Sequence, residues 1–180
     1  MRIISGKVRG LKLKTPAGED TRPTLDRVKE AVFSMILPFI IDSKVLDLFA
    51  GSGALGIESL SRGALSAVFV DSSADAIDCI NSNVNSARFG SVSLVKKVDS
   101  ISFLKENKEC FDIIFLDPPY QKNMYTKSLE GILTNNALSN EGIVVVEYDN
   151  SLVELTIPDE FIILKEKKYG KVGIVILKRG

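Results

Sequence analysis

Residues 45–56 read V-L-D-L-F-A-G-S-G-A-L-G, and this stretch decides the fold. Four of its first five residues are apolar, with Asp47 as the exception, which predicts a buried strand. Gly51 and Gly53 then predict a tight turn, because glycine adopts positive φ angles and lets a ligand approach the backbone. Residues 54–62 have helical composition. A strand, a glycine turn and a helix in this order predict an α/β fold with a ligand site at the carboxyl end of a parallel strand.

Two classes of nucleotide ligand fit this glycine turn. The spacing of Gly51, Gly53 and Gly56 matches G-x-G-x-x-G, and Asp71 follows at the spacing of a ribose-binding acid, so a dinucleotide is one candidate. Asp47 favours the other candidate. A carboxylate just before the turn would repel a pyrophosphate, but it would pair with the α-ammonium of S-adenosylmethionine. A turn that only closes a strand–helix unit is the alternative without any ligand.

The next strand and helix supply further candidate cofactor residues. Residues 67–70 predict a second strand that ends in Asp71, whose carboxylate could accept hydrogen bonds from both ribose hydroxyls of an adenosine. Asp99 begins a later helix, where it either caps the helix or contacts the adenine amine. The residues that we expect around the cofactor are Asp47, Phe49, Ala50, Gly51, Gly53, Asp71, Ser72 and Asp99.

The second strong motif is D-P-P-Y at residues 117–120, which follows an apolar strand candidate at residues 111–116. Two consecutive prolines fix φ and keep the chain extended, so Asp117 and the nearby carbonyl groups become rigid acceptors at the top of the sheet. Tyr120 adds a flat aromatic face. Acceptors beside a stacking surface suit a planar amine, such as a nucleobase taken out of its stack. A proline turn that only leaves a strand is the alternative.

Length and composition describe an ordinary globular protein. The chain has 180 residues, of which 45% are hydrophobic and 26% charged, so we expect one domain over residues 1–180. The longest apolar stretch, residues 32–41, is too short to span a membrane, and the N-terminus does not resemble a secretory signal; we therefore expect a cytoplasmic protein. The chain has no histidine, which excludes imidazole-based triads and His-ligated zinc; we expect no metal.

The net charge of zero hides an uneven distribution of charge. Residues 1–29 hold eight Lys/Arg and three Asp/Glu, residues 161–180 hold six and one, and the remainder holds nine and nineteen. Two basic ends around an acidic middle favour a polyanionic substrate such as nucleic acid, although a solvated charged surface explains either run alone. The candidate RNA-binding residues are Lys7, Arg9, Lys12, Lys14, Arg22 and Arg27.

The other elements follow from periodicity and turn residues. Residues 3–14 predict a short basic strand pair, and residues 21–37 open a helix that Pro38 ends. Further helices are expected at 73–87 and 124–135, and further strands at 92–95, 142–147, 161–165 and 172–177, the last two joined as a hairpin.

Three further stretches carry a resemblance to a known family. They are R-I-I-S-G-K-V-R-G-L-K-L at residues 2–13, R-P-T-L-D-R-V-K-E-A-V-F at 22–33 and Y-G-K-V-G at 169–173. Together with D-L-F-A-G-S-G-A-L-G and D-P-P-Y, they make nearly the whole chain similar to the bacterial small-subunit (16S) ribosomal RNA guanine-N2 methyltransferases. Those enzymes are Rossmann-like, class I and S-adenosylmethionine-dependent. Val8, Ser73 and the pair Lys171-Val172 depart from that family's pattern.

The resemblance implies a seven-stranded, mostly parallel sheet with its last strand antiparallel, helices on both faces, and a basic N-terminal extension over residues 1–40. It implies methyl transfer to the exocyclic amine of a guanine, in ribosomal RNA that already carries ribosomal proteins, by a monomeric enzyme. Asp117 and the Pro118 carbonyl would accept hydrogens from the amine, Pro119 would keep the motif extended, and Tyr120 would stack on the base.

Two other functions fit parts of the same pattern. A DNA amino-methyltransferase acting on adenine or cytosine uses the same tetrapeptide type, but it would need a target-recognition domain for which the chain has little room. A non-catalytic RNA-binding assembly factor could keep a relic cofactor site. The intact Asp47, Asp71 and D-P-P-Y argue against such decay.

Overall fold

The computed structural model describes residues 1–16, 23–119 and 122–180, with backbone only for residues 23–25 and 122. The elements follow one another in a largely alternating α/β order. They are α1 (Pro23–Met35), η1 (Leu37–Phe39), β1 (Lys44–Asp47), α2 (Ala54–Ser61), β2 (Ser66–Asp71), α3 (Ala74–Ala87), η2 (Gly90–Val92), β3 (Ser93–Lys97), α4 (Ser100–Glu106), β4 (Phe111–Leu116), α5 (Lys122–Thr134), β5 (Leu138–Asp149), β6 (Phe161–Tyr169) and β7 (Val172–Arg179).

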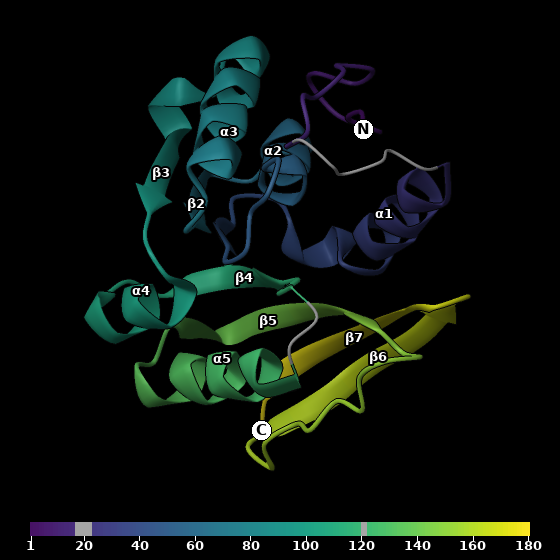
Figure 1. Ribbon diagram of the computed structural model, residues 1–180, viewed down its shortest axis with the longest axis vertical. Helices are drawn as coiled ribbons and strands as arrows, with labels where there is room; N and C mark the ends of the chain where they lie inside the picture. The colour runs from purple at the N-terminus through teal and green to yellow at the C-terminus, as the bar shows by residue number, and fades with distance from the viewer. Residues whose placement is uncertain (17–22, 120–121) are drawn as a thin grey trace.

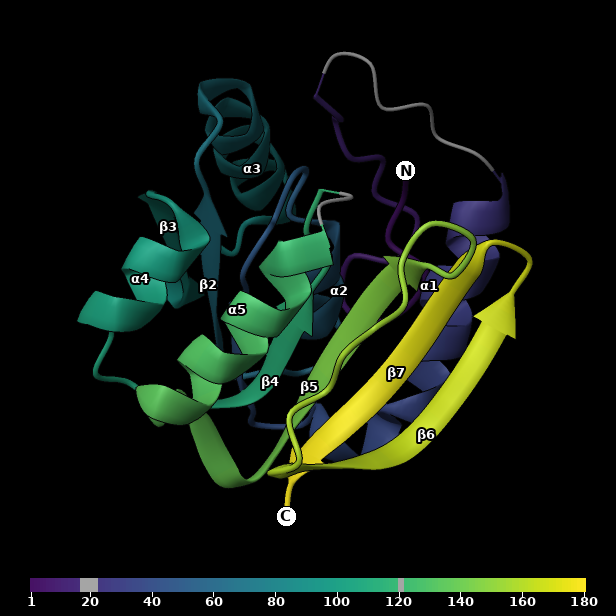
Figure 2. The same ribbon diagram turned by 60° about the horizontal axis from the view of Figure 1, so that its bottom comes forward.

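The seven strands form one sheet in the order β3-β2-β1-β4-β5-β7-β6. Strands β1 to β5 pair in parallel, and β7 pairs antiparallel with both β5 and β6. Figure 2 shows the arrowheads of β2, β4 and β5 pointing to the same end of the molecule, where the N-terminal segment also lies. This is the expected sheet, including the antiparallel last strand. The carboxyl ends of the central strands therefore meet at one edge.

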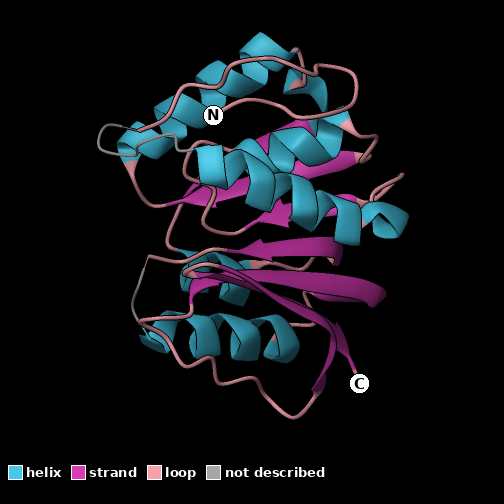
Figure 3. Ribbon diagram, turned by 90° about the vertical axis from the view of Figure 1, so that its right-hand side faces the viewer, coloured by secondary structure: helices cyan, strands magenta, loops and turns pink. Residues whose placement is uncertain are grey.

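Helices cover both faces of the sheet (Figures 1 and 3). Helices α1, α2 and α3 pack on one face and bury Phe33, Ile57 and Ile80 against strand residues such as Phe69. Helices α4 and α5 pack on the other face over a second apolar cluster that includes Tyr125. Strands β1 and β4 have buried residues facing both layers, which explains why their sequences are nearly continuous apolar runs rather than alternating ones.

Helix α1 and strand β5 differ from their expected bounds. Helix α1 ends at Met35, and Pro38 lies inside the short 3-10 helix that follows. Strand β5 begins at Leu138 rather than at residue 142, because Leu138 pairs with Phe111 across a register shift in β4. Within the described residues, no helix is long and apolar enough to cross a membrane.

The N-terminal segment, residues 1–16, differs from the expected strand pair. Its two arms share a single antiparallel bridge, Arg2 with Lys12, rather than a ladder. Backbone hydrogen bonds from the N–H groups of Ile3, Gly10 and Leu13 also join the two arms. The N–H groups of Ile4 and Ser5 donate instead to the Glu58 carboxylate of α2 at 2.8 and 3.0 Å. A carboxylate on the body of the protein thus holds the segment against α2.

Candidate functional site

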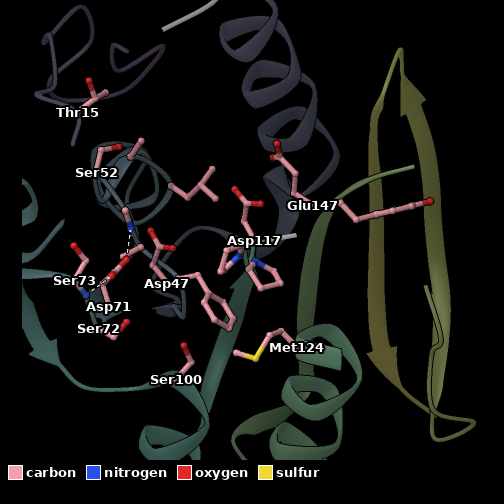
Figure 4. Close-up of a pocket in the computed structure, with 18 of the residues that line it drawn as sticks. Thr15, Asp47, Ser52, Asp71, Ser72, Ser73, Ser100, Asp117, Met124 and Glu147 are labelled. Atoms are coloured by element: carbon pink, nitrogen blue, oxygen red, sulfur yellow. Dashed lines mark hydrogen bonds between the residues drawn. The ribbon is translucent and has the colours of Figure 1, made fainter. Parts of the chain in front are cut away.

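A cleft of about 700 Å³ opens at the carboxyl ends of the central strands, where parallel α/β sheets bind ligands. Figure 4 shows its side chains, which come from the ends of several strands and from the loops that follow them. The residues that line it include Met1, Thr15, Lys29, Asp47, Phe49, Ala50, Gly51, Ser52, Leu55, Asp71, Ser72, Asp99, Asp117, Pro118, Pro119, Met124, Glu147, Tyr148, Asp149 and Lys171. All the predicted cofactor residues except Gly53 are in this lining.

Asp47 is the most buried acid of the cleft, with 3% of its surface exposed. It ends β1, and its Oδ2 accepts a hydrogen bond from the backbone N–H of Gly56 at 3.0 Å. Burial raises the pKa of Asp47 to about 7; the Gly56 hydrogen bond opposes this shift, and the nearby Asp71 charge adds to it. A positively charged group bound next to this carboxyl would lower its pKa again and favour the ionised form.

The glycine turn has the conformation that its sequence predicts. Gly51 and Gly53 have φ angles of 53° and 76°, and Gly53 caps the N-terminus of α2. Gly56 has a different role, because a Cβ atom there would lie 2.3 Å from a ring carbon of Phe69 on β2. The first two glycines thus shape the turn, and the third lets α2 pack closely on the sheet.

Asp71 connects the glycine turn to the next loop. Its Oδ2 accepts from the Gly51 N–H and its Oδ1 accepts from the Ser73 N–H, both at 2.9 Å (Figure 4). Each carboxylate oxygen has further acceptor capacity toward the cleft. Asp99 accepts from the Ser102 N–H at 2.9 Å and so caps α4, while it also lines the cleft. The cap is therefore observed, and a contact with adenine stays a prediction.

The D-P-P-Y motif leaves β4 on the other side of the cleft from Asp71. Asp117 and Pro119 are exposed and Pro118 is buried, and all three line the cleft. Figure 4 shows the Asp117 carboxyl pointing into the pocket. Tyr120 lies outside the described residues. Asp117, an exposed hydrogen-bond acceptor, therefore lines the same cleft as the predicted cofactor residues.

The N-terminal segment contributes directly to the cleft wall. Asn83 of α3 is buried, and its side chain accepts from the Lys14 N–H at 2.8 Å and donates to the carbonyls of Lys14 and Ser52, each at 2.9 Å. Met1 and Thr15 line the cavity as a result. One amide side chain therefore joins the basic segment to the glycine turn, a connection that sequence spacing did not suggest.

The predicted RNA-binding residues lie at the surface, where described. Lys7, Arg9, Lys12 and Lys14 are exposed along the N-terminal segment. Arg27 is exposed on α1 and does not line the cleft. Arg22 lies outside the described residues. Met1 and Thr15 of the same segment line the cleft, so the segment that carries these four cations borders it. This placement suits a polyanion that also reaches the cleft.

Two charged residues that line the cleft, Lys29 and Glu147, received no role in the sequence analysis. Lys29 of α1 is buried and donates to Glu58 at 3.1 Å and to the Arg2 carbonyl; burial lowers its pKa and the Glu58 charge opposes that shift. Glu147 of β5 lines the cleft and was not predicted at all. A signal existed, because Glu147 follows the apolar run 143–146 just as Asp117 follows residues 111–116.

Comparisons with known proteins identify the family. The family model described as Conserved hypothetical protein 95 matches residues 1–178. Ribosomal RNA small subunit methyltransferase D of Escherichia coli K12 is 33% identical over 179 residues, covering 99% of this chain and 90% of that protein. The protein of the same name from Haemophilus influenzae is 37% identical over 176 residues, covering 96% of this chain and 91% of that protein.

Solved structures agree with these relatives. The yhhF chain from Escherichia coli superposes with a TM-score of 0.89 at 31% identity, covering 99% of this chain and 97% of that chain. A chain titled SMU.776, solved with SAH, has a TM-score of 0.72 at 14% identity, covering 88% of this chain and 50% of that chain, and supports the fold only. The chain therefore belongs to the Conserved hypothetical protein 95 family of small-subunit ribosomal RNA methyltransferases, with the class I methyltransferase fold.

Proposed function

We propose that this protein transfers a methyl group from S-adenosylmethionine to the exocyclic N2 amine of a guanine in small-subunit ribosomal RNA. One observation carries the proposal. The Asp117 carboxyl, after β4, opens into the same cleft as Asp47 and Asp71, at the ends of β1 and β2. A methyl donor on Asp47 and Asp71 and an amine on Asp117 would then share one cavity, as direct transfer requires.

The cofactor half of the cleft suits a nucleoside with a cationic tail. Asp47 would pair with the α-ammonium, since a buried carboxyl with a raised pKa is stabilised by an adjacent positive charge. Asp71 would accept the ribose hydroxyls with the acceptor capacity that Gly51 and Ser73 leave free. The Asp47 carboxylate beside the glycine turn disfavours a pyrophosphate, so we do not propose a dinucleotide. When bound, S-adenosylmethionine supplies the electrophilic methyl group.

The substrate half of the cleft suits an amine that is a weak nucleophile. The N2 lone pair of guanine is delocalised into the purine ring, so acceptors that bind the amine hydrogens favour a more tetrahedral nitrogen and orient its lone pair. Asp117 and the Pro118 carbonyl would be those acceptors, and Pro119 would hold them in place. As the N–CH₃ bond forms and the S–CH₃ bond breaks, the nitrogen becomes acidic, and its surplus proton can pass to Asp117.

Guanine is the preferred base on hydrogen-bonding grounds. It presents its amine and its ring N–H side by side as donors, and a carboxylate such as Asp117 is an acceptor only. Adenine presents a donor beside an acceptor, which an amide would match better. This pattern, with the small-subunit RNA relatives, favours guanine over the adenine or cytosine of a DNA enzyme.

The polyanion would enter from the side of the N-terminal extension, residues 1–40. Lys7, Arg9, Lys12 and Lys14 would bind phosphates there, and Arg27 would extend that surface along α1. We propose that the substrate is a partly or fully assembled particle in the cytoplasm and that the enzyme acts as a monomer of one domain.

A methyl-transfer assay distinguishes these functions. The protein is incubated with labelled S-adenosylmethionine and with small-subunit particles from cells that lack this enzyme, with naked ribosomal RNA or with DNA. Label in particles supports the proposal, label in DNA alone supports the DNA enzyme, and no label on any substrate with intact cofactor binding supports an assembly factor.

A further inference from the structure

Glu147 lies near the carboxyl end of β5, beside Asp117. Strands β4 and β5 pair with Leu116 opposite Val146, so the next residues of the two strands, Asp117 and Glu147, come at the same level of neighbouring parallel strands. Both line the cleft, and Figure 4 shows both carboxyls on the same part of its wall. The substrate half of the site therefore contains two carboxyl groups, only one of which the proposed methyl transfer uses.

The surroundings of the two carboxyls differ. Ile143 and Val145 alternate with Val144 and Val146, and the first pair faces the apolar cluster under α1, so period-two alternation puts Glu147 on the α1 side. Glu147 is partly buried there, whereas Asp117 is exposed. Among the described residues, no hydrogen bond or ion pair reaches the Glu147 carboxyl. Burial raises the pKa of Glu147 to about 7.

The charged groups around this part of the cleft do not reverse that effect. Asp117 comes from the loop after β4, and Asp149 follows on β5 with a pKa lowered mainly by its hydrogen bonds to Ser151. Among the described residues, two lysines line the cleft: Lys29 of α1 is paired with Glu58, and Lys171 is exposed on the β6–β7 turn. Tyr148 also lines the cleft, and its raised pKa keeps it neutral. Burial favours the neutral form of the Glu147 carboxyl, so one carboxyl of the pair can donate while the other accepts.

We propose that Glu147 is a specificity-determining residue whose neutral carboxyl donates a hydrogen bond to O6 of the target guanine. The inference rests on the proposed function. Along the edge of guanine, the order of groups is amine, ring N–H and O6, that is, two donors and then an acceptor. Asp117 would accept from the first two, and the adjacent Glu147 O–H would donate to the third. With adenine's amine at Asp117, the ring nitrogen comes next and then a C–H, so Glu147 would have no acceptor.

The test compares Glu147→Gln, which keeps a neutral donor, with Glu147→Ala, which removes it. Methyl transfer to small-subunit particles is measured as kcat/KM from pH 6 to 9. The neutral fraction of Glu147 falls about tenfold per pH unit above its pKa, so the ratio of Glu147→Gln to wild type should rise as pH increases above about 7. Titrations shared by both proteins cancel in this ratio. Glu147→Ala should lose at least about tenfold at pH 6, and Glu147→Gln only a few-fold.

Cofactor affinity and melting temperature serve as controls, since neither variant touches the cofactor residues. A Glu147→Gln variant that is as inactive as Glu147→Ala, or a ratio that does not change with pH, would overturn the inference. If the glutamine variant does not fold, the wild-type KM for particles decides instead, because it should rise with pH above about 7. Wild-type protein that methylates no particle refutes the proposed function, which is a different result.

Discussion

The Asp71 carboxylate accepts a hydrogen bond from the Gly51 N–H at 2.9 Å, although the two residues are 20 positions apart. This bond joins the end of β2 to the glycine turn after β1, so the same acid that would bind the ribose also shapes the turn beside it. One side chain would thus both bind the cofactor and position the glycine turn.

Replacing Asp71 with Ala should weaken S-adenosylmethionine binding by about 1.5 to 3 kcal/mol, the scale of a lost hydrogen bond to a charged group. Calorimetry measures this, with Asp75→Ala as the control, since Asp75 is an exposed acid in the first turn of α3. NAD should bind neither protein. Unchanged affinity in Asp71→Ala, or NAD binding to the wild type, would contradict the assignment of this turn.

Cofactor binding should release protons, because burial raises the pKa of Asp47 to about 7 and an ammonium would pull it down. Below pH 7 the free protein carries a proton on Asp47 that the complex would lose, so release should approach one proton at pH 6 and vanish by about pH 8 to 9. Calorimetry in two buffers of different ionisation enthalpy measures this release, and Asp47→Asn should abolish it. Proton release that is equal in the two proteins would mean that another group titrates.

The raised pKa of Asp47 also affects how the folding stability depends on pH. The direction is opposite to that of a carboxyl group whose pKa is lowered by folding. The folded pKa lies above the unfolded value of 3.8, so Asp47 binds more protons in the folded state between about pH 4 and 7. Its contribution to the stability of the cofactor-free protein therefore falls as pH rises through that window.

Neutralising Lys7, Arg9, Lys12 and Lys14 should lower RNA affinity and reduce its dependence on salt, because fewer counterions are released. Cofactor affinity should not change. A matched variant neutralises four exposed lysines of β3 and the α4 region, Lys96, Lys97, Lys105 and Lys108. Equal salt slopes for the two variants would show that the N-terminal cations are only a solvated surface.

Asn83→Ala should destabilise the protein by about 2 to 4 kcal/mol, since it removes three hydrogen bonds and leaves backbone groups of Lys14 and Ser52 without this partner. Denaturant unfolding measures the loss. Asn85→Ala is the control, because Asn85 is exposed on the same helix. If both variants have the same free energy of unfolding, Asn83 does not hold the N-terminal segment to the glycine turn.

The sequence predicts those parts of the structure that depend on residues adjacent in the chain. Residues 111–116 form β4 with the expected bounds, because a nearly continuous apolar run is typical of a parallel strand buried between two helical layers. The glycine turn is equally local, since the φ angles of Gly51 and Gly53 limit the residues allowed there.

The rest depends on partners far away in the chain. The two arms of the N-terminal segment share one antiparallel bridge rather than a strand ladder, and Glu58, more than fifty positions away, binds the Ile4 and Ser5 amides. Glu147 comes next to Asp117 only through the β4–β5 register. Neither local propensity nor periodicity contains that information.

Asp117→Asn tests the chemistry of the site. The variant should fold and bind cofactor normally, because Asp117 is exposed and follows β4, away from Asp71 at the end of β2. Methyl transfer to particles should fall about 100-fold or more, the scale of losing a preorganised acceptor at the reacting group and facing a donor with a donor.

The most direct measurement is mass spectrometry of the nucleosides from particles incubated with the wild type and with Asp117→Asn. We predict N2-methylguanosine in the wild-type reaction and a loss of about 100-fold in the variant. Methyl groups on adenine or cytosine instead of guanine N2, or an asparagine variant within a few-fold of wild type, would contradict the claim that Asp117 presents a guanine amine to the methyl donor.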